Sequence, residues 1–250
     1  MLTLLAALPP AWGEGGGLAA PFSPLDYGAI CTLSALASSG EAGGIWAQTD
    51  GSGNPLALVS ARFLSLAIPY PQEWGEELRL FLSGFPSPLL CLPDAASSLG
   101  LAGEESRLLL CRALKPGETA DPLPPDCPSG ELWAFLRGIF PGCPELEPFR
   151  ATLFAGRKSG RRLTLPARDT AGRLIACAEM AHCHSGTAIL ENIAVSPAHR
   201  GKGLGHAVTE ALCRQLASRG LKRALVACRP ALRPFYEGMG FAPCGWLVKV

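Results

Sequence analysis

The sequence has few charged residues, no run of five Lys or Arg, and no apolar stretch long enough to cross a bilayer. Charged residues make up 17% of the 250 positions. The most apolar stretch, Leu56 to Ile68, contains Arg62, whereas a membrane-spanning helix needs roughly 18 consecutive apolar residues. Clustered basic residues are typical of nucleic-acid binders. These absences predict a protein that binds neither membrane nor nucleic acid, and the 48% hydrophobic residues are enough to form a full-sized core.

The sequence also lacks the signs of secretion. The apolar start MLTLLAAL has no basic residue before it and ends at Pro9-Pro10, so it lacks the charged region that opens a secretory signal. The ten cysteines include no CxxC pair, and several lie within apolar runs such as LLLCRAL, which is typical of buried, reduced thiols. We expect a protein of the reducing cytoplasm.

One short cluster, His182-Cys183-His184, has side chains of the kinds that bind metals. His182 and His184 would share one face of a strand. No second ligand cluster follows at a recognisable spacing. The sequence therefore predicts no metal site.

Charge divides the chain into two unlike halves. Residues 1–103 hold 2 basic and 8 acidic side chains, and residues 104–250 hold 20 and 13. The halves therefore carry −6 and +7, and the basic half suits an anionic small ligand. We predict two domains, 1–103 and 104–250.

Residue patterning in the second half predicts an alternation of strands and helices. Leu204, Val208, Leu212 and Leu216 recur every four residues within a helix predicted over 201–219. The other predicted helices cover 131–140, 145–156 and 232–239, and the predicted strands cover 107–113, 162–169, 172–183, 187–195, 222–228 and 241–250. This order predicts an α/β fold with a mixed central sheet flanked by helices.

The first half resembles a blurred version of the same order and predicts a second, smaller α/β domain. Strands are expected over 45–50, 55–68 and 88–92, a helix over 76–82, and a further element over 95–100. The turn Asp50-Gly-Ser-Gly53 occupies the place that Asp169-Thr-Ala-Gly172 has in the second half. Two unrelated α/β segments remain the alternative.

The most informative segment is Ile193-Ala-Val-Ser-Pro-Ala-His-Arg-Gly-Lys-Gly-Leu-Gly205, in which a strand leads through a glycine-rich loop into a helix. The first turn of a helix presents N–H groups without intrahelical partners, and its dipole adds positive charge. Glycines let a phosphate approach the main chain. Arg200 and Lys202 add formal charge. The segment predicts a phosphate-binding loop.

Two common nucleotide motifs do not fit this loop. A dinucleotide fingerprint would require Gly or Ala at position 206 or 208, which hold His206 and Val208. A P-loop would require Ser or Thr after Lys202, where Gly203 stands. The remaining pattern is RxxGxG, formed by Arg200, Gly203 and Gly205.

This pattern resembles the acetyl-CoA loop of the GNAT N-acetyltransferase superfamily, (Q/R)xxGx(G/A). Val195 and Pro197 precede it as in the family, and Phe235-Tyr-Glu-Gly-Met-Gly-Phe241 is similar to the family's FYxxxGF junction. The resemblance covers about residues 104–250, with the dense matches within 187–241. Residues 1–103 would then form a degenerate GNAT-like or accessory domain.

The resemblance implies acetyl-CoA as acyl donor, held between two splayed strands. Main-chain groups of the strand would pair with the pantetheine arm, and loop amides would bind the pyrophosphate. The implied binding residues are Ile193, Ala194, Val195, Arg200, Gly201, Lys202, Gly203, Leu204 and Gly205. Where many members have Asn, seven residues before the tyrosine, this chain has Arg229, which leaves contacts from that position open.

Transfer of an acetyl group from a thioester to an amine requires a base for the ammonium, an oxyanion donor and an acid for the thiolate. Glu191 precedes Val195 by four residues, where some family members have an acidic base; a salt-bridged strand residue is the alternative. Tyr236 stands where the family keeps its general acid; a core tyrosine is the alternative. A main-chain N–H near Val195 could polarise the carbonyl.

The sequence thus predicts a cytoplasmic acetyl-CoA-dependent N-acetyltransferase acting by direct attack in a ternary complex, with an unknown amine acceptor and with a homodimer left open. The alternative is a non-catalytic acyl-CoA-binding or protein-interaction module. A dinucleotide-dependent oxidoreductase is not expected, because the loop lacks the dinucleotide fingerprint. In the first half, Pro69 to Glu77 has prolines and acidic residues where a phosphate loop would stand, so we expect no CoA site there.

Overall fold

The computed structural model describes residues 2–5, 22–23, 25–39, 44–67, 69–85, 88–117 and 120–250. The chain forms two compact units that interleave in sequence. The first comprises Met1–Leu110, Ala227–Pro234 and Ala242–Val250, and the second comprises Cys111–Val226 and Phe235–Phe241. The division of the chain into domains at residues 103 and 104 remains a proposal.

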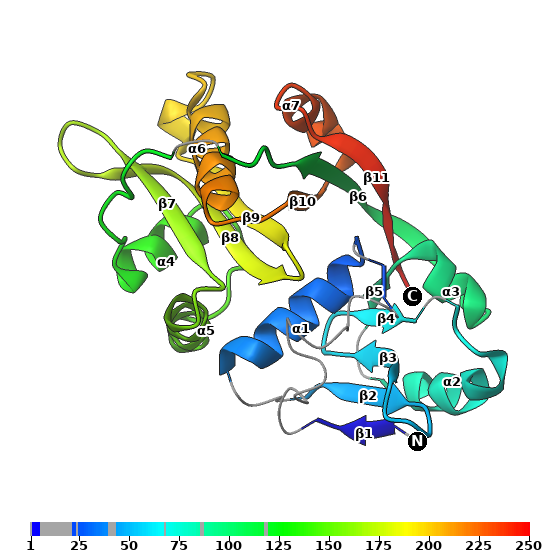
Figure 1. Cartoon of the computed structure of the whole chain (residues 1–250). Helices are drawn as coiled ribbons and strands as arrows, with labels where there is room; N and C mark the ends of the chain where they lie inside the picture. Colours follow the sequence, from blue (N-terminus) through cyan, green and yellow to red (C-terminus); the bar gives the residue numbers. More distant parts are fainter. Residues whose placement is uncertain are drawn as a thin grey trace. The chain divides into compact units, whose positions relative to one another are not determined.

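The first unit contains a four-stranded sheet and three helices (Figure 1). The sheet has the order β1-β2-β3-β4, and each neighbouring pair is antiparallel. A shorter run of strands has the order β5-β11-β6. The bounds are β1 Leu2–Leu4, α1 Tyr27–Ser39, β2 Trp46–Thr49, β3 Pro55–Val59, β4 Leu64–Leu66, α2 Gly75–Ser83, β5 Leu90–Cys91, α3 Pro93–Ser98, β6 Glu104–Ala113 and β11 Ala242–Lys249.

Two hydrophobic clusters hold this unit together. Residues of α1, among them Leu33 and Leu36, pack against Ala47 of β2 and Leu58 of β3. The next residues along the strands point to the other face, as the pleat requires. There, Ala57 and Val59 join a second cluster with side chains of α2 and α3.

The sequence prediction was wrong at one strand of this unit and missed one helix. The single strand expected over 55–68 is two strands, β3 and β4, because the chain turns between them and the Ser60 amide donates to the Phe63 carbonyl over 2.9 Å. The helix α1 was not predicted. Of the apolar start, residues 2–4 form β1, whereas Pro9 and Pro10 lie outside the described residues.

The two turns that looked alike in sequence have the same hydrogen-bond pattern. Oδ1 of Asp50 accepts from the amides of Ser52 and Asn54, and Oδ1 of Asp169 accepts from those of Ala171 and Arg173. Gly53 and Gly172 follow with φ of 82° and 78°, the left-handed region that favours glycine. Each turn joins an antiparallel strand pair, β2 to β3 or β7 to β8.

The second unit contains a sheet of order β10-β9-β8-β7. The first three strands in sequence, β7, β8 and β9, are antiparallel neighbours, and β10 lies parallel to β9. The bounds are α4 Ser129–Arg137, α5 Leu146–Lys158, β7 Leu163–Arg168, β8 Leu174–His184, β9 Thr187–Val195, α6 Leu204–Ser218, β10 Arg223–Cys228 and α7 Arg233–Glu237.

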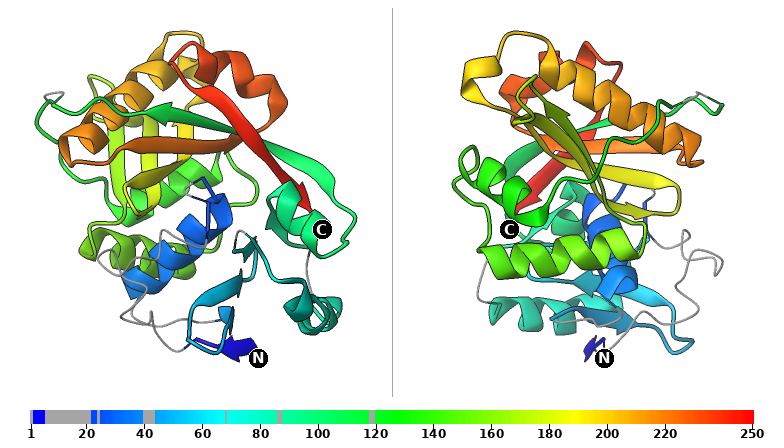
Figure 2. Two further views of the ribbon diagram at one scale, coloured as in Figure 1. Left: turned by 45° about the vertical axis from the view of Figure 1, so that its right-hand side comes forward. Right: turned by 90° about the vertical axis from the view of Figure 1, so that its left-hand side faces the viewer.

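Helices cover both faces of this sheet. Figure 2 shows α4 and α5 on one side and α6 on the other. Leu132 and Leu136 of α4 and Leu153 of α5 cluster with Cys177 of β8 and Ala194 of β9. The mixed sheet flanked by helices confirms the predicted fold class for this part of the chain.

None of the helices in the described ranges is long and apolar enough to cross a membrane. All ten cysteines are free thiols. Burial raises the pKa of the Cys91 thiol to about 12 and that of Cys127 to about 11, so both are protonated near neutral pH.

Candidate active site

The strands β9 and β10 separate part-way along their length. Their parallel pairing joins Arg223 to Thr187, Ala224 to Ala188 and Leu225 to Ile189, and the register ends there. Beyond Ile189, β9 continues to Val195 while still paired with β8 on its other side. The stretch 190–195 therefore has a main-chain edge that β10 does not use.

A bulge in β9 accompanies this separation. Asn192 has a φ of 51°, the left-handed region, which costs a non-glycine residue about 1 kcal/mol or more. The register between β8 and β9 shifts between Cys177 and Glu179. The Asn192 side chain donates to Oε2 of Glu179 over 2.5 Å, and this bond holds the bulged conformation in place.

Glu179 lies at the centre of a buried polar cluster. Its side chain is fully buried and also accepts hydrogen bonds from Arg162 Nη2 at 3.0 Å and Thr164 Oγ1 at 2.7 Å. Burial alone would raise the pKa of this carboxyl, but the Arg162 charge and the three sets of hydrogen bonds outweigh it and hold the pKa below its usual value. The sequence does not indicate this cluster, because its members come from β7, β8, β9 and the residue before β7.

The glycine-rich loop after β9 is open. Gly201 and Gly203 have φ of 74° and 76°, and a Cβ added at either position would meet nothing within 4 Å. Arg200 is exposed, and its Nε donates to the Val195 carbonyl over 3.3 Å. Lys202 is also exposed. Both basic side chains therefore border open space.

The main-chain donors of this loop have no acceptor among the described residues. The amide of Ala207 donates to the Gly203 carbonyl and begins the helical ladder of α6. Within the part of the chain that the structure describes, the amides of residues 201–206 donate to no backbone or side-chain group. Six adjacent amides are thus left for solvent or an anion, at the start of a 15-residue helix with no acidic residue in its first turn.

Gly205 allows close packing at the first turn of α6. A Cβ there would lie 3.4 Å from the Phe235 ring and 3.5 Å from Cγ2 of Val195. The helix start at Gly205 therefore lies within van der Waals range of both the end of β9 and the FYxxxGF segment. The predicted loop residues from Arg200 to Gly205, the strand residues Ile193 to Val195 and Phe235 all belong to the second unit.

Tyr236 belongs to the same unit but is more buried than the loop. Its side chain is 7% exposed, and its ring makes edge contacts with Phe235 at 5.0 Å and Phe241 at 5.6 Å between centroids. Both neighbours come from the FYxxxGF match. The aromatic packing fits the core alternative, and Tyr236 as an acid remains a proposal.

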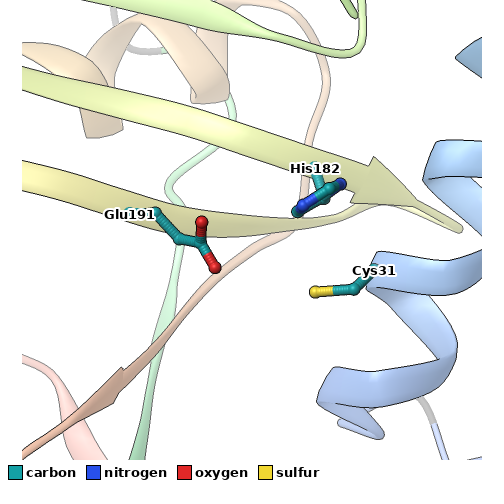
Figure 3. Close-up of side chains that lie close together, drawn as sticks. All are labelled: Cys31, His182 and Glu191. Carbon is teal, nitrogen blue, oxygen red and sulfur yellow. The ribbon is translucent and has the colours of Figure 1, made fainter. Parts of the chain in front are cut away.

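Glu191 lies on β9 beside Glu179 of β8, since the two are register partners. A carboxylate oxygen of Glu191 and a ring nitrogen of His182 lie within 4.8 Å of each other. Figure 3 shows His182 on β8 and Glu191 on β9, with the carboxylate reaching toward the imidazole; Cys31, also labelled, belongs to α1 of the first unit. From the sequence alone, His182 is a candidate metal ligand only.

Two other histidines flank the loop. His199 Nδ1 lies 2.8 Å from Oγ of Ser196, and His206 is exposed on the first turn of α6. Arg229, at the position where the family often has Asn, is exposed and belongs to the first unit.

The corresponding segment of the first unit is built differently. Between β4 and α2 the chain forms a 3-10 turn, Gln72–Trp74, in which the Trp74 amide donates to Pro71 and the Gly75 amide to Gln72. Glu77 in the first turn of α2 accepts from the side chain of Gln48. The segment before α2 therefore has fewer free main-chain donors and less positive charge than the loop before α6, and both are needed to bind a phosphate.

A model of the Acetyltransferase (GNAT) family matches residues 131–241. This region is a GNAT acetyltransferase domain. The match includes the glycine-rich loop, both splayed strands and the FYxxxGF segment. No curated protein matches the chain significantly.

Solved structures of GNAT proteins share the fold at low identity. A GCN5-related N-acetyltransferase from Sphaerobacter thermophilus is 16% identical, with a TM-score of 0.54 over 82% of this chain and 79% of its own. A GNAT-family acetyltransferase from Colwellia psychrerythraea is also 16% identical, with a TM-score of 0.53 over 82% and 84%. A tandem GNAT protein from the clavulanic acid biosynthesis pathway is 14% identical, with a TM-score of 0.57 over 100% and 97%. The last match covers both units and agrees with a GNAT fold preceded by a further α/β domain.

Proposed function

We propose that the protein is an N-acetyltransferase that transfers the acetyl group of acetyl-CoA to an amine in a ternary complex. The observation that carries this proposal is the row of amides at residues 201–206, which lack acceptors in the described part of the chain. A diphosphate satisfies several such donors at once and suits the positive end of the α6 dipole. GNAT membership of residues 131–241 supports an acyltransferase in general.

The donor would be held by the second unit alone. Amides of Gly201 to Gly205 and the exposed side chains of Arg200 and Lys202 would bind the diphosphate. Main-chain groups of β9 from Ile193 to Val195 would pair with the amide groups of the pantetheine arm, in the place that β10 leaves. An N–H near Val195 would then polarise the thioester carbonyl.

The proton transfers are assigned to side chains near the same strand. Glu191 takes the proton of the incoming ammonium, and His182, whose ring nitrogen lies within 4.8 Å of that carboxylate, orients it. Tyr236 donates a proton to the departing thiolate. The free thiols support a reducing compartment, and we propose the cytoplasm.

Release of CoA measures turnover. Purified protein is incubated with acetyl-CoA and a panel of small-molecule amines and peptides with free amino groups, and free thiol is detected. We expect release with at least one amine class, acceleration as the pH rises, and a product carrying one acetyl group by mass spectrometry. CoA binding without turnover on every amine would contradict the proposal.

That outcome defines the second candidate, a non-catalytic acyl-CoA-binding or interaction module. The buried ring of Tyr236, packed between Phe235 and Phe241, favours it. We also propose that the first unit binds no CoA. Calorimetry on the full chain tests this: we expect one CoA per chain, and two would overturn it.

A further inference from the structure

A small cavity lies in the first unit, separate from the cofactor loop. Its volume is about 200 Å³. A water molecule takes up about 30 Å³ of liquid, so the cavity has room for a ligand of about five or six heavy atoms. Its walls are mainly apolar and include Leu66, Ala67, Pro69 and Leu92.

A buried carboxyl group borders the cavity. Asp26 is 4% exposed and lines the cavity. The amide of Ala29 and the hydroxyl of Ser65 both donate to its Oδ1, each at 2.9 Å. The amide of Gly28 also donates to this carboxyl group.

The other described groups around this carboxyl are acidic, aromatic or thiol side chains. Asp94 of α3 is exposed and lines the same cavity, as does Tyr70, whose hydroxyl donates to Gln48. The Cys91 thiol of β5 lies near enough for the Asp26 charge to raise its pKa. Among the residues that the structure describes, no Arg, Lys or His lines the cavity. A buried carboxyl group at the start of α1 therefore borders a mainly apolar space that has no cationic side chain among its described walls.

We propose that this cavity binds a small alkylammonium ion, whose charged head pairs with the Asp26 carboxylate and whose carbon chain contacts the apolar walls. A cation there supplies the charge and the N–H donors that a buried carboxylate requires. The proposal concerns the first unit and does not depend on catalysis in the second. It gives the first unit a binding role of its own.

Butylammonium is the probe, with butan-1-ol and butyrate as neutral and anionic controls. Binding to the full chain is followed by calorimetry at pH 8 in phosphate buffer and by NMR of the backbone amides. We expect binding of butylammonium alone, with shifts at residues of α1 and α3. Burial raises the pKa of Asp26 to about 6, so binding should weaken as the pH falls through that value.

The decisive variant is Asp26→Asn, which keeps an oxygen for Ala29 and Ser65 but removes the charge. We expect its dissociation constant for butylammonium to rise at least about tenfold, the size of one lost charge-assisted hydrogen bond. The rim control Asp94→Asn should change it less, and Glu191→Gln, in the other unit, should not change it. Ala95→Leu, which narrows the cavity without altering charge, should also weaken binding.

No binding by the wild-type chain, or equal binding by Asp26→Asn, would overturn the proposal. Sensitivity to Glu191→Gln instead would place the amine in the acetyltransferase domain and would overturn it as well. A backbone-amide NMR spectrum of each variant that keeps the wild-type dispersion of first-unit signals shows that this unit is folded.

Discussion

Asn192 and Glu179 are joined by a 2.5 Å hydrogen bond from the carboxamide of one strand to the buried carboxylate of the next. The bond holds a left-handed residue in β9 at the place where β9 and β10 separate. The bulge and the gap therefore depend on a polar cluster beneath the strand, as well as on the glycine-rich loop after it.

Changing Asn192 to Asp tests this dependence. The substitution keeps the size of the side chain but places a second carboxylate against Glu179, and we expect a loss of about 3 kcal/mol in the free energy of unfolding, as for other broken buried charge pairs. Asn192→Gly is the matched control, because it loses the bond but tolerates positive φ. Urea unfolding measures both. An equal loss in the two variants would contradict the electrostatic account.

Glu179 should also make stability depend on pH. Its pKa is lowered in the folded state, so the unfolded chain binds the proton more readily and stability is lost as the pH falls below about 4.3, the usual value for Glu. At neutral pH the contribution is complete. Glu179→Gln leaves the buried Arg162 without its partner. We expect this variant to lose about 3 kcal/mol in the free energy of unfolding at pH 7 and to lose less stability than the wild type as the pH falls below about 4.3. If the variant lost stability at acid pH as the wild type does, another carboxyl group would be responsible for the effect.

The amides at residues 201–206 can be tested with a pair of glycines. Gly203 and Gly220 have φ of 76° and 81°, and neither has an atom within 4 Å of an added Cβ. Each change to Ala should therefore cost about 1 kcal/mol in stability. Only Gly203→Ala should weaken CoA binding, by about tenfold or more, because its methyl group stands where a diphosphate would approach. Equal CoA affinities would remove the loop from the binding site.

Tyr236→Phe separates catalysis from packing. The change keeps the aromatic contacts with Phe235 and Phe241 and removes the proton donor, so kcat should fall about 100-fold while CoA affinity stays the same. Tyr70→Phe, in the first unit, is the control for loss of a phenol. A kcat unchanged by Tyr236→Phe would leave Tyr236 as a core residue only.

Asp26→Asn should stabilise the protein in the absence of amines. Burial raises the pKa of Asp26 from 3.8 to about 6, so the ionised form destabilises the fold, and this cost grows as the pH rises from about 4 to 6. Two pK units correspond to about 3 kcal/mol. We expect a gain of that order at pH 8 and none at pH 3.5, from urea unfolding in phosphate buffer. A loss at pH 8 would mean that the carboxylate is already compensated.

Local pattern was sufficient to predict the loop and most of the second unit. The four-residue repeat of Leu204 and its successors and the positive-φ glycines are local signals, and the structure has a helix and left-handed turns there. The helix α1 was missed, although Asp26 caps it by accepting from the amide of Ala29, because its sequence is apolar on nearly every side.

The contacts between neighbouring strands could not be predicted from the sequence. Arg162, Glu179 and Asn192 are far apart in the chain and meet only through the register of β7, β8 and β9. The proximity of His182 to Glu191 depends on the same register. The prediction of a single strand over 55–68 was wrong for a different reason. The turn at Ser60 has no glycine or proline to mark it.

The early end of the β9–β10 ladder has a consequence for handling the protein. Unsatisfied peptide groups along a strand recruit other chains, and natural sheets protect them. Here the exposed row lies in the interior of a sheet, where the proposed pantetheine arm would act as its cover. Protein freed of CoA should therefore aggregate more readily on storage than protein saturated with CoA. Light scattering would measure the difference.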